Sequence, residues 1–162
     1  MKTTNFLSID LNQVSETIKA VIGGHQTLAE LNQVEDSQLD QCYESAIALY
    51  NESRMVEALP KFAYLAMHNP WCRDFLFGLA STLHALQQTE HALVFYGYVT
   101  LMDACDAGAT FRIGQCYLSL GKKNEAMDAL YTSIEQSFLT PEQPEIRSFA
   151  QSLLDDITDH RI

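Results

Sequence analysis

The sequence predicts an all-α protein, a short α-solenoid of three tandem helical repeats with amphipathic helices before them and a capping helix after them. Three observations predict this fold. The chain has 162 residues, 47% of them hydrophobic, with only four prolines and seven glycines, as is typical of a folded helical domain. Small and large residues recur at intervals of 34 positions. Before and after this recurring stretch, apolar residues fall on single helix faces.

The repeat is defined by four columns of equivalent positions. The two small columns hold Ala46, Ala80 and Gly114, and Ala58, Ala92 and Ala126. The two large columns hold Leu49, Leu83 and Tyr117, and Phe62, Tyr96 and Leu130. This period and alternation are typical of the tetratricopeptide repeat, a helix-turn-helix unit. Its small residues lie where paired helices approach closely, and its large residues fill the space between them.

The repeats are expected to occupy residues 37–140, as units 39–70, 73–106 and 107–140. The first helices of the units should span about 38–52, 73–86 and 107–120, and the second about 55–68, 90–103 and 123–137. Gly121 is suited to the left-handed residue that ends many helices, and Pro70 ends the first unit. Pro60 falls inside an expected helix, which therefore either starts late or kinks there.

The region 1–36 is expected to be helical and to precede the repeats. Asp10 is a candidate N-cap for a helix over 10–22. One face of that helix carries Leu11, Val14, Ile18, Val21 and Ile22. Gly23 and Gly24 then break the chain, and a short helix with Leu28, Leu31 and Val34 follows.

The region 141–162 is expected to form a capping helix and tail. Pro144 starts this last helix, which carries Ile146, Phe149, Leu153, Leu154 and Ile157. A terminal repeat must hide its apolar face from water, and this helix is expected to do so.

The charge and the cysteines exclude several classes of function. A net charge of -11 argues against nucleic acid as a partner and against docking on anionic membranes. No apolar stretch is long enough to insert in a membrane, and the N-terminus lacks the apolar core of a secretory signal. The four cysteines match no metal site, and we expect reduced thiols in a cytoplasmic protein with no metal and no cofactor. Those cysteines are Cys42, Cys72, Cys105 and Cys116.

Four stretches carry a resemblance to a known family. They are GGHQTLAELNQV (23–34), LDQCYESAIALYNESRMVEAL (39–59), FLFGLASTLHAL (75–86) and YGYVTLMD (96–103). In their order and spacing they resemble the class II chaperones of bacterial type III secretion, which serve the pore-forming translocator proteins. The resemblance covers about residues 10–158. The third repeat departs from the family pattern, because GATFRIGQC (108–116) lacks the Pro-Phe pair that is usual near its start.

The resemblance implies a concave groove, lined by positions 2, 5, 9 and 12 of each first helix. Those positions are Asp40, Tyr43, Ile47 and Tyr50, then Asp74, Phe77, Ser81 and His84, then Gly108, Phe111, Gln115 and Leu118. It also implies a client segment of the form Pro-x-Leu-x-x-Pro, bound to keep a membrane-seeking translocator soluble and competent for export. Tyr43, Tyr50, Phe77 and Phe111 are the expected anchors, with core packing as the alternative for each.

The N-terminal helix has two interpretations. It either packs over the first repeat or dimerises through Leu11, Val14, Ile18 and Ile22, as the family often does. We expect a homodimer in the absence of client.

Other functions are less favoured by the residues. The five histidines are scattered, no nucleophile triad or phosphate loop is present, and an enzyme is not expected. A tetratricopeptide clamp for acidic C-termini would need Lys or Arg in the groove columns, which hold Asp40 and Asp74 instead. A different tetratricopeptide adaptor or scaffold, or a regulatory protein, stays open as the alternative.

Overall fold

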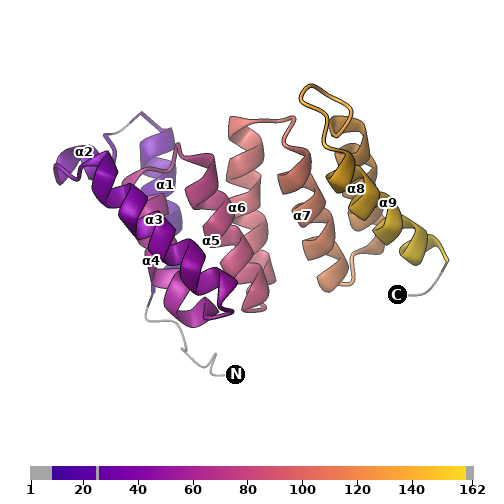
Figure 1. Ribbon diagram of the computed structural model, residues 1–162, viewed down its shortest axis with the longest axis horizontal. Helices are drawn as coiled ribbons and strands as arrows, with labels where there is room; N and C mark the ends of the chain where they lie inside the picture. The colour runs from indigo at the N-terminus through magenta and orange to yellow at the C-terminus, as the bar shows by residue number, and fades with distance from the viewer. Residues whose placement is uncertain (1–8, 25, 160–162) are drawn as a thin grey trace. The chain divides into compact units, whose positions relative to one another are not determined.

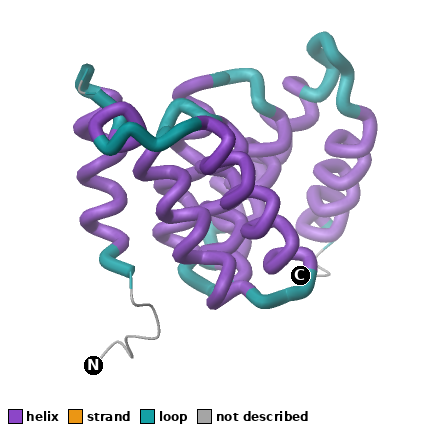
Figure 2. Tube along the Cα trace, turned by 60° about the vertical axis from the view of Figure 1, so that its left-hand side comes forward, coloured by secondary structure: helices purple, strands orange, loops and turns teal. Residues whose placement is uncertain are grey.

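The computed structural model describes residues 9–24 and 26–159, and every regular element in these ranges is an α-helix (Figures 1 and 2). Before the repeats lie α1 (Leu11–Ile22) and α2 (Leu28–Leu31). The repeat helices are α3 (Asp36–Asn51), α4 (Met55–His68), α5 (Arg73–Ala85), α6 (Thr89–Met102), α7 (Ala107–Ser119) and α8 (Lys123–Gln136). The chain ends with α9 (Pro144–Thr158). The expected all-α fold is confirmed, and each expected helix is present within about two residues of its predicted bounds.

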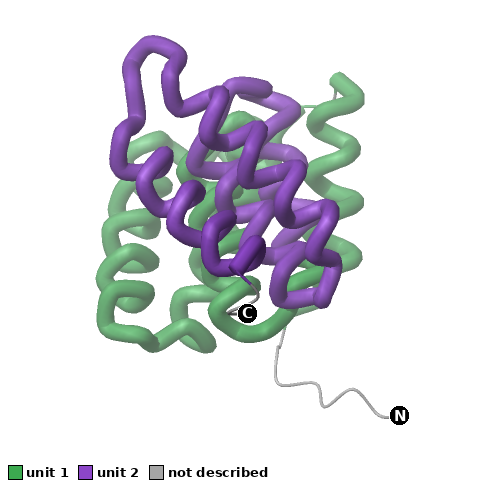
Figure 3. The backbone as a smooth tube through the Cα atoms, turned by 90° about the vertical axis from the view of Figure 1, so that its right-hand side faces the viewer, with its two compact units in different colours: residues 1–91 green, residues 92–162 purple. Residues whose placement is uncertain are grey.

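The chain divides into two compact units, residues 1–91 and 92–162, coloured separately in Figure 3. In the N-terminal unit α4 is the central helix, because it contacts α1, α2, α3 and α5. Its buried side chains accordingly cover most of its circumference. They are Ala58, Leu59, Phe62, Ala63, Leu65, Ala66 and His68. Pro60 lies on the exposed side, and α4 begins at Met55 as predicted, so the helix does not start late.

The start of α1 follows from its capping residue. The side chain of Asp10 accepts hydrogen bonds from the backbone N–H groups of Asn12 and Gln13, at 3.0 and 3.2 Å. This confirms Asp10 as the N-cap and satisfies two donors that the helix itself leaves unpaired. The short helix α2 is closed by a capping box between Thr27 and Glu30.

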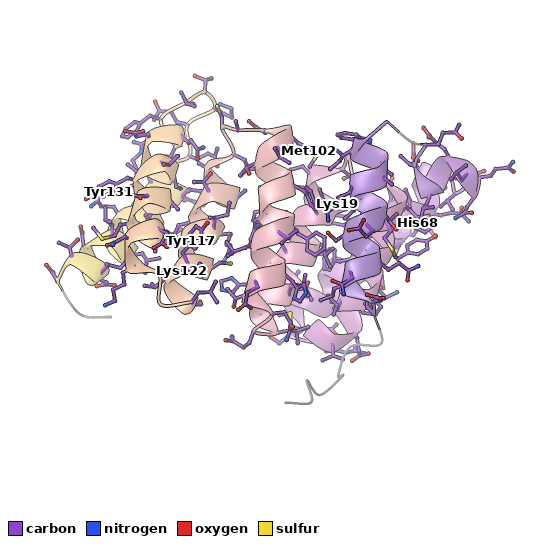
Figure 4. The ribbon with its side chains drawn as sticks, turned by 180° about the vertical axis from the view of Figure 1, so that it is seen from behind. Lys19, His68, Met102, Tyr117, Lys122 and Tyr131 are labelled. Carbon is purple, nitrogen blue, oxygen red and sulfur yellow. The ribbon has the colours of Figure 1, made fainter. Side chains whose placement is uncertain are left out.

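The C-terminal unit packs α7, α8 and α9 around one core. Its buried members are Phe111, Ala126, Leu130, Ala150, Leu154 and Ile157. A Cβ placed on Gly114 would lie 3.1 Å from the Leu130 side chain and 3.4 Å from the Ala126 carbonyl oxygen. The helices can approach this closely only because position 114 has no side chain, which confirms the packing role predicted for the small columns. Figure 4 labels Tyr117, in the last turn of α7, and Lys122, in the turn before α8, and the Lys122 ammonium lies 5.9 Å from the Tyr117 ring centroid.

The turns that join the two helices of each repeat share one backbone geometry. Ser53, Gln87 and Gly121 lie 34 residues apart, and all have left-handed φ angles, of 61°, 60° and 71°. In each turn the next N–H donates back to a carbonyl five residues earlier in the helix, as in Arg54 to Leu49 at 2.9 Å. Gly121 was predicted to take this conformation. Ser53 and Gln87 take it as well, although they carry a Cβ.

The last helix covers the end of the C-terminal core, as predicted. Ala150, Leu154 and Ile157 are buried, and Arg147 ties the preceding loop to the helix through the Ser137 carbonyl oxygen at 3.1 Å. Phe149 was expected on the same apolar face, but its side chain is 59% exposed.

Candidate peptide-binding face

The groove residues predicted on α3 form a half-buried row. Tyr43, Ile47 and Tyr50 are each partly exposed, and Asp40 at the start of the row is exposed. The Tyr43 ring rests edge-on against Phe62 of α4, with centroids 6.2 Å apart, and lies 5.5 Å from the Phe75 ring. Tyr43 is therefore supported from below by two core aromatics and keeps one side open.

One of the residues predicted on α5, Phe77, has an aromatic ring that is covered by a neighbouring cation. Phe77 and His84 are half-buried, and Ser81 is buried with 8% of its surface exposed. The Arg73 guanidinium carbon lies 4.1 Å from the centroid of the Phe77 ring, within the range of a cation–π contact. Arg73 also forms an ion pair of 3.1 Å with Asp74. The predicted anchor Phe77 is thus capped by a neighbouring positive charge.

The two helices contact each other, and their polar groups share one electrostatic environment. Partial burial raises the pKa of Tyr43, and the negative charge of Asp74 raises it further, whereas Arg73 acts in the opposite direction. Tyr43 on α3 therefore lies within reach of the charged pair at the start of α5. The N-terminal unit brings together an aromatic ring from each helix and one guanidinium.

Sequence reasoning missed Arg73 because it considered only four columns of each first helix. Two signals could have identified it. Arg73 precedes Phe77 by four residues, the spacing at which helical side chains meet. Its equivalents in the other repeats, 34 residues away, are Leu39 and Ala107, which are buried with 3% and 0% exposed. Arg73 is therefore the charged member of a column that is buried and apolar in the other two repeats.

The four groove residues predicted on α7 belong to the C-terminal unit. Phe111 is only 8% exposed and is a member of that unit's core, so the core-packing alternative describes it better than an open anchor does. Leu118 is half-buried against the same core, and Gln115 accepts a hydrogen bond from Arg112 at 2.9 Å. Gly108 is buried.

A shallow hollow of about 400 Å³ lies between α7 and α9. It is lined by Phe111, Arg112, Gln115, Phe149, Ser152, Leu153 and Asp156. The rings of Phe111 and Phe149 are 6.4 Å apart, centroid to centroid. Phe149 lines this hollow, although the columns that predict the groove residues did not include it.

The residues predicted for dimerisation are mostly covered within the N-terminal unit. Leu11, Val14 and Ile18 are 9%, 2% and 0% exposed, and α1 contacts α4. The burial of Leu11, Val14 and Ile18 therefore fits the interpretation that α1 packs over the first repeat. Ile22 differs, because 39% of its side chain is exposed at the end of α1.

The described residues hold no cluster of three or more His, Cys, Asp or Glu side chains that could bind a metal ion. His68, labelled in Figure 4, stacks on Tyr64 with centroids 3.9 Å apart, and its Nδ1 lies 2.8 Å from the Tyr64 carbonyl oxygen. These contacts within α4 give His68 a structural role. His25 and His160 lie outside the described residues.

In the described part of the chain, no helix combines the length and the apolar character that crossing a membrane requires.

Comparisons with known proteins point to one family. No protein-family profile matches the chain. Among curated proteins it is 26% identical over 148 residues to the low calcium response locus protein H of Yersinia pseudotuberculosis, an alignment that covers 91% of this chain and 88% of the relative.

Solved structures give the same result. The type III secretion translocator chaperone SycD of Yersinia enterocolitica matches with a TM-score of 0.75 and 27% identity, over 82% of this chain and 98% of SycD. A second SycD structure, in complex with a peptide of the translocator YopD, matches with a TM-score of 0.72 and 25% identity, over 80% of this chain and 98% of that one. The tetratricopeptide-like fold is confirmed.

Proposed function

Since the chain is related to the type III secretion translocator chaperones, we propose that it is itself such a chaperone. It binds a segment of a hydrophobic translocator protein and keeps that protein soluble and competent for secretion. The observation that carries this proposal is the row of half-buried aromatic side chains on α3 and α5, at positions that no packing column requires. Large aromatic side chains that are partly exposed on rigid helices can pack against the apolar side chains of an extended peptide.

The support beneath the Tyr43 ring favours binding. Tyr43 rests on Phe62 and Phe75, so it loses little conformational freedom when a peptide covers it. Tyr50 and Phe77 offer further apolar surface on the same two helices. Anchors of this kind contribute about 2 kcal/mol or more each when truncated in other interfaces. Phe111, Gln115 and Leu118 are secondary contacts in this proposal, because the Phe111 ring is mainly a core group.

The acidic surface serves the same function. A complex with an aggregation-prone client needs a charged exterior to stay in solution, and the chain contributes a net charge of -11. We place the protein in the bacterial cytoplasm, where the client is made. It acts by binding alone, without catalysis and without a cofactor.

In the absence of client the protein forms a homodimer in this proposal. Ile22 is the predicted dimerisation residue that the N-terminal unit leaves exposed, and we expect it to contribute directly. Leu11, Val14 and Ile18 then support the interface from beneath. Replacing Ile22 with Asp should shift the protein to monomer in sedimentation, whereas an unchanged dimer would exclude this end of α1.

The test of the main proposal is co-expression with candidate hydrophobic translocator proteins, followed by co-purification. Wild-type protein should yield a soluble complex. Tyr50→Ala and Phe77→Ala should lose most of it while keeping the circular dichroism spectrum of the wild type. Tyr43→Leu is preferable to Ala, because it preserves part of the packing on Phe62.

Tyr131→Ala is the matched control, because Tyr131 is an exposed aromatic on α8 with 52% of its surface accessible. It should retain the complex. If the client stays insoluble in the presence of wild-type protein, the result favours the alternative function, a tetratricopeptide scaffold that binds another partner. A complex indifferent to all groove variants would move the binding site away from α3 and α5.

A further inference from the structure

We infer that the hollow between α7 and α9 is a second contact site for the client, which takes an aromatic side chain followed by a carboxylate. The inference rests on the proposed function and adds a site in the C-terminal unit, together with the chemistry of the segment that fills it. Its basis is an exposed aromatic ring, Phe149, and a guanidinium, Arg112, that line one hollow of about 400 Å³.

The hollow has an apolar base to which both helices contribute. The Phe111 ring of α7 lies 6.4 Å from the Phe149 ring of α9, centroid to centroid, with 31° between the ring planes. Leu153, one turn after Phe149, lines the hollow and is half-buried. The core side of α9 is occupied by other residues, which include Ala150 and Leu154. An aromatic side chain of a ligand can therefore pack on this base without displacing the core.

Phe149 is the part of this base that folding leaves in water. Its side chain is 59% exposed. Single exposed apolar residues are common on protein surfaces and indicate nothing by themselves. Phe149 differs from these because it lies at the edge of a hollow that contains a second aromatic ring. A ligand side chain that covers it removes apolar surface from water, which favours binding.

Arg112 supplies the positive charge of the site. Its Nη1 donates a hydrogen bond to the amide oxygen Oε1 of Gln115 at 2.9 Å, and within the described residues no ion pair joins it to a carboxylate. A guanidinium carries five N–H donors, so the contact with Gln115 leaves others for a ligand. Basic residues elsewhere in the chain do pair with carboxylates: Lys19, Arg54, Arg73 and Arg147.

An aromatic side chain in the hollow makes a neighbouring carboxylate favourable. Because Arg112 lines the same hollow, a side chain that fills it removes water from the guanidinium. Donors that lose water without gaining an acceptor weaken binding, and a carboxylate can accept from two N–H groups at once. Asp156, on the α9 wall, has an interaction of its own, and its negative charge disfavours a carboxylate there. The favoured position is therefore on the α7 wall, at Arg112.

The shallowness of the hollow identifies the client as its occupant. A site that holds one side chain and one carboxylate binds weakly by itself. A segment that is tethered to the same protein through another contact has an effective concentration on the order of millimolar, so even weak binding then becomes significant. A client that is held on α3 and α5 meets this condition, whereas a separate partner does not.

The test uses isotope-labelled full-length protein and titration with blocked dipeptides at pH 7, followed by NMR. The dipeptides are acetyl-Phe-Asp-amide, acetyl-Phe-Asn-amide and acetyl-Ala-Asp-amide. The Phe-Asp peptide should shift backbone signals around Phe111 and Phe149 and bind about tenfold more tightly than the Phe-Asn peptide. The Ala-Asp peptide should bind too weakly to measure, because it leaves the rings uncovered. Raising the salt concentration should reduce the preference for Asp.

Variants then assign each part of the preference. In Arg112→Gln the Phe-Asp and Phe-Asn peptides should bind within about twofold of each other, and Arg112→Lys should keep part of the difference. Phe149→Ala should weaken both Phe peptides by the same factor and keep the preference for Asp. Tyr131→Ala, which removes an exposed aromatic ring from α8, is the control and should change neither. A purely structural role for Arg112 would weaken both Phe peptides equally.

Three results would overturn the inference. One is a wild-type protein that binds the Phe-Asp and Phe-Asn peptides equally or binds neither at α7 and α9. Another is an Arg112→Gln variant that keeps the full preference. The third is a complex with a translocator that binds the Phe-Asp peptide as tightly as the free protein does, because a client that fills the hollow must exclude the peptide.

The proposed function has a separate measurement, the co-purification of a whole translocator and its dependence on Tyr50 and Phe77. Co-purification can fail while the peptides bind at α7 and α9, and it can succeed while they do not. The two failures are therefore distinguishable.

Discussion

Phe77 and Phe111 occupy the same position of consecutive repeats, yet they have different surroundings. Phe77 in the N-terminal unit is half-buried, and a guanidinium covers part of its ring. Phe111 in the C-terminal unit is 8% exposed and packs with Ala126, Leu130 and Leu154. The repeat column fixes which helix face a residue occupies. What packs against that face decides whether the residue binds a partner or fills a core.

The largest expected effect tests this difference directly. Phe111→Ala should lower the free energy of unfolding by about 3–5 kcal/mol, because it leaves a cavity in the C-terminal core. Phe77→Ala should cost only about 1 kcal/mol, since the ring is half-exposed in the folded protein. Urea denaturation monitored by circular dichroism measures both. Equal losses would mean that the two positions are equally structural.

A second pair of variants tests close helix packing in the N-terminal unit. A Cβ on Gly78 would collide with the Phe62 ring, so Gly78→Ala should destabilise the protein by about 1–3 kcal/mol. Phe62 also supports Tyr43, and client binding should weaken in the same variant. Gly97→Ala is the matched control, because a Cβ there meets no heavy atom within 4 Å. It should be neutral or stabilising by about 0.5–1 kcal/mol. Similar melting curves for both variants would contradict the packing.

The three equivalent turns provide a smaller effect. Ser53→Gly and Gln87→Gly should each stabilise the protein by about 1 kcal/mol, because glycine adopts left-handed φ angles without strain. Gly121→Ala should destabilise it by a similar amount, although a Cβ at Gly121 meets no atom within 4 Å. Thermal melting checks all three. A destabilising Ser53→Gly would show that the serine side chain compensates for its backbone.

The smallest effect concerns cysteine chemistry and leaves stability unchanged. Burial raises the pKa of Cys116 to about 12, so this thiol is protonated and covered at pH 8. Cys105 is exposed. Labelling with a thiol reagent at pH 8 should modify Cys105 in the folded protein and Cys116 only after unfolding. Rapid modification of Cys116 would indicate that the C-terminal core opens readily.

The sequence predicted the helices more completely than the binding face. The 34-residue columns and the caps at Asp10 and Gly121 are local signals, and the helices begin and end where those signals predict. The binding face depends on contacts between distant residues. The burial of Phe111 depends on α9, which follows it by more than thirty residues, and no repeat column records that contact.

Arg73 and Phe149 show the same limit. Arg73 was passed over because the groove was described by columns, although its spacing from Phe77 predicts their contact. Phe149 was assigned to the buried face of the last helix, because its apolar character does not distinguish one edge of that face from the other. Its exposure was visible only once Ala150, Leu154 and Ile157 were seen to fill the interface.

The central claim is that the client lies on the α3–α5 face of the N-terminal unit. The most direct measurement is photo-crosslinking in cells that co-produce a translocator, with benzoylphenylalanine placed at Phe77 or, as a control, at Tyr131. The account predicts a crosslinked complex from position 77 and none from position 131. Crosslinking at 131 alone, or equally at both positions, would contradict it.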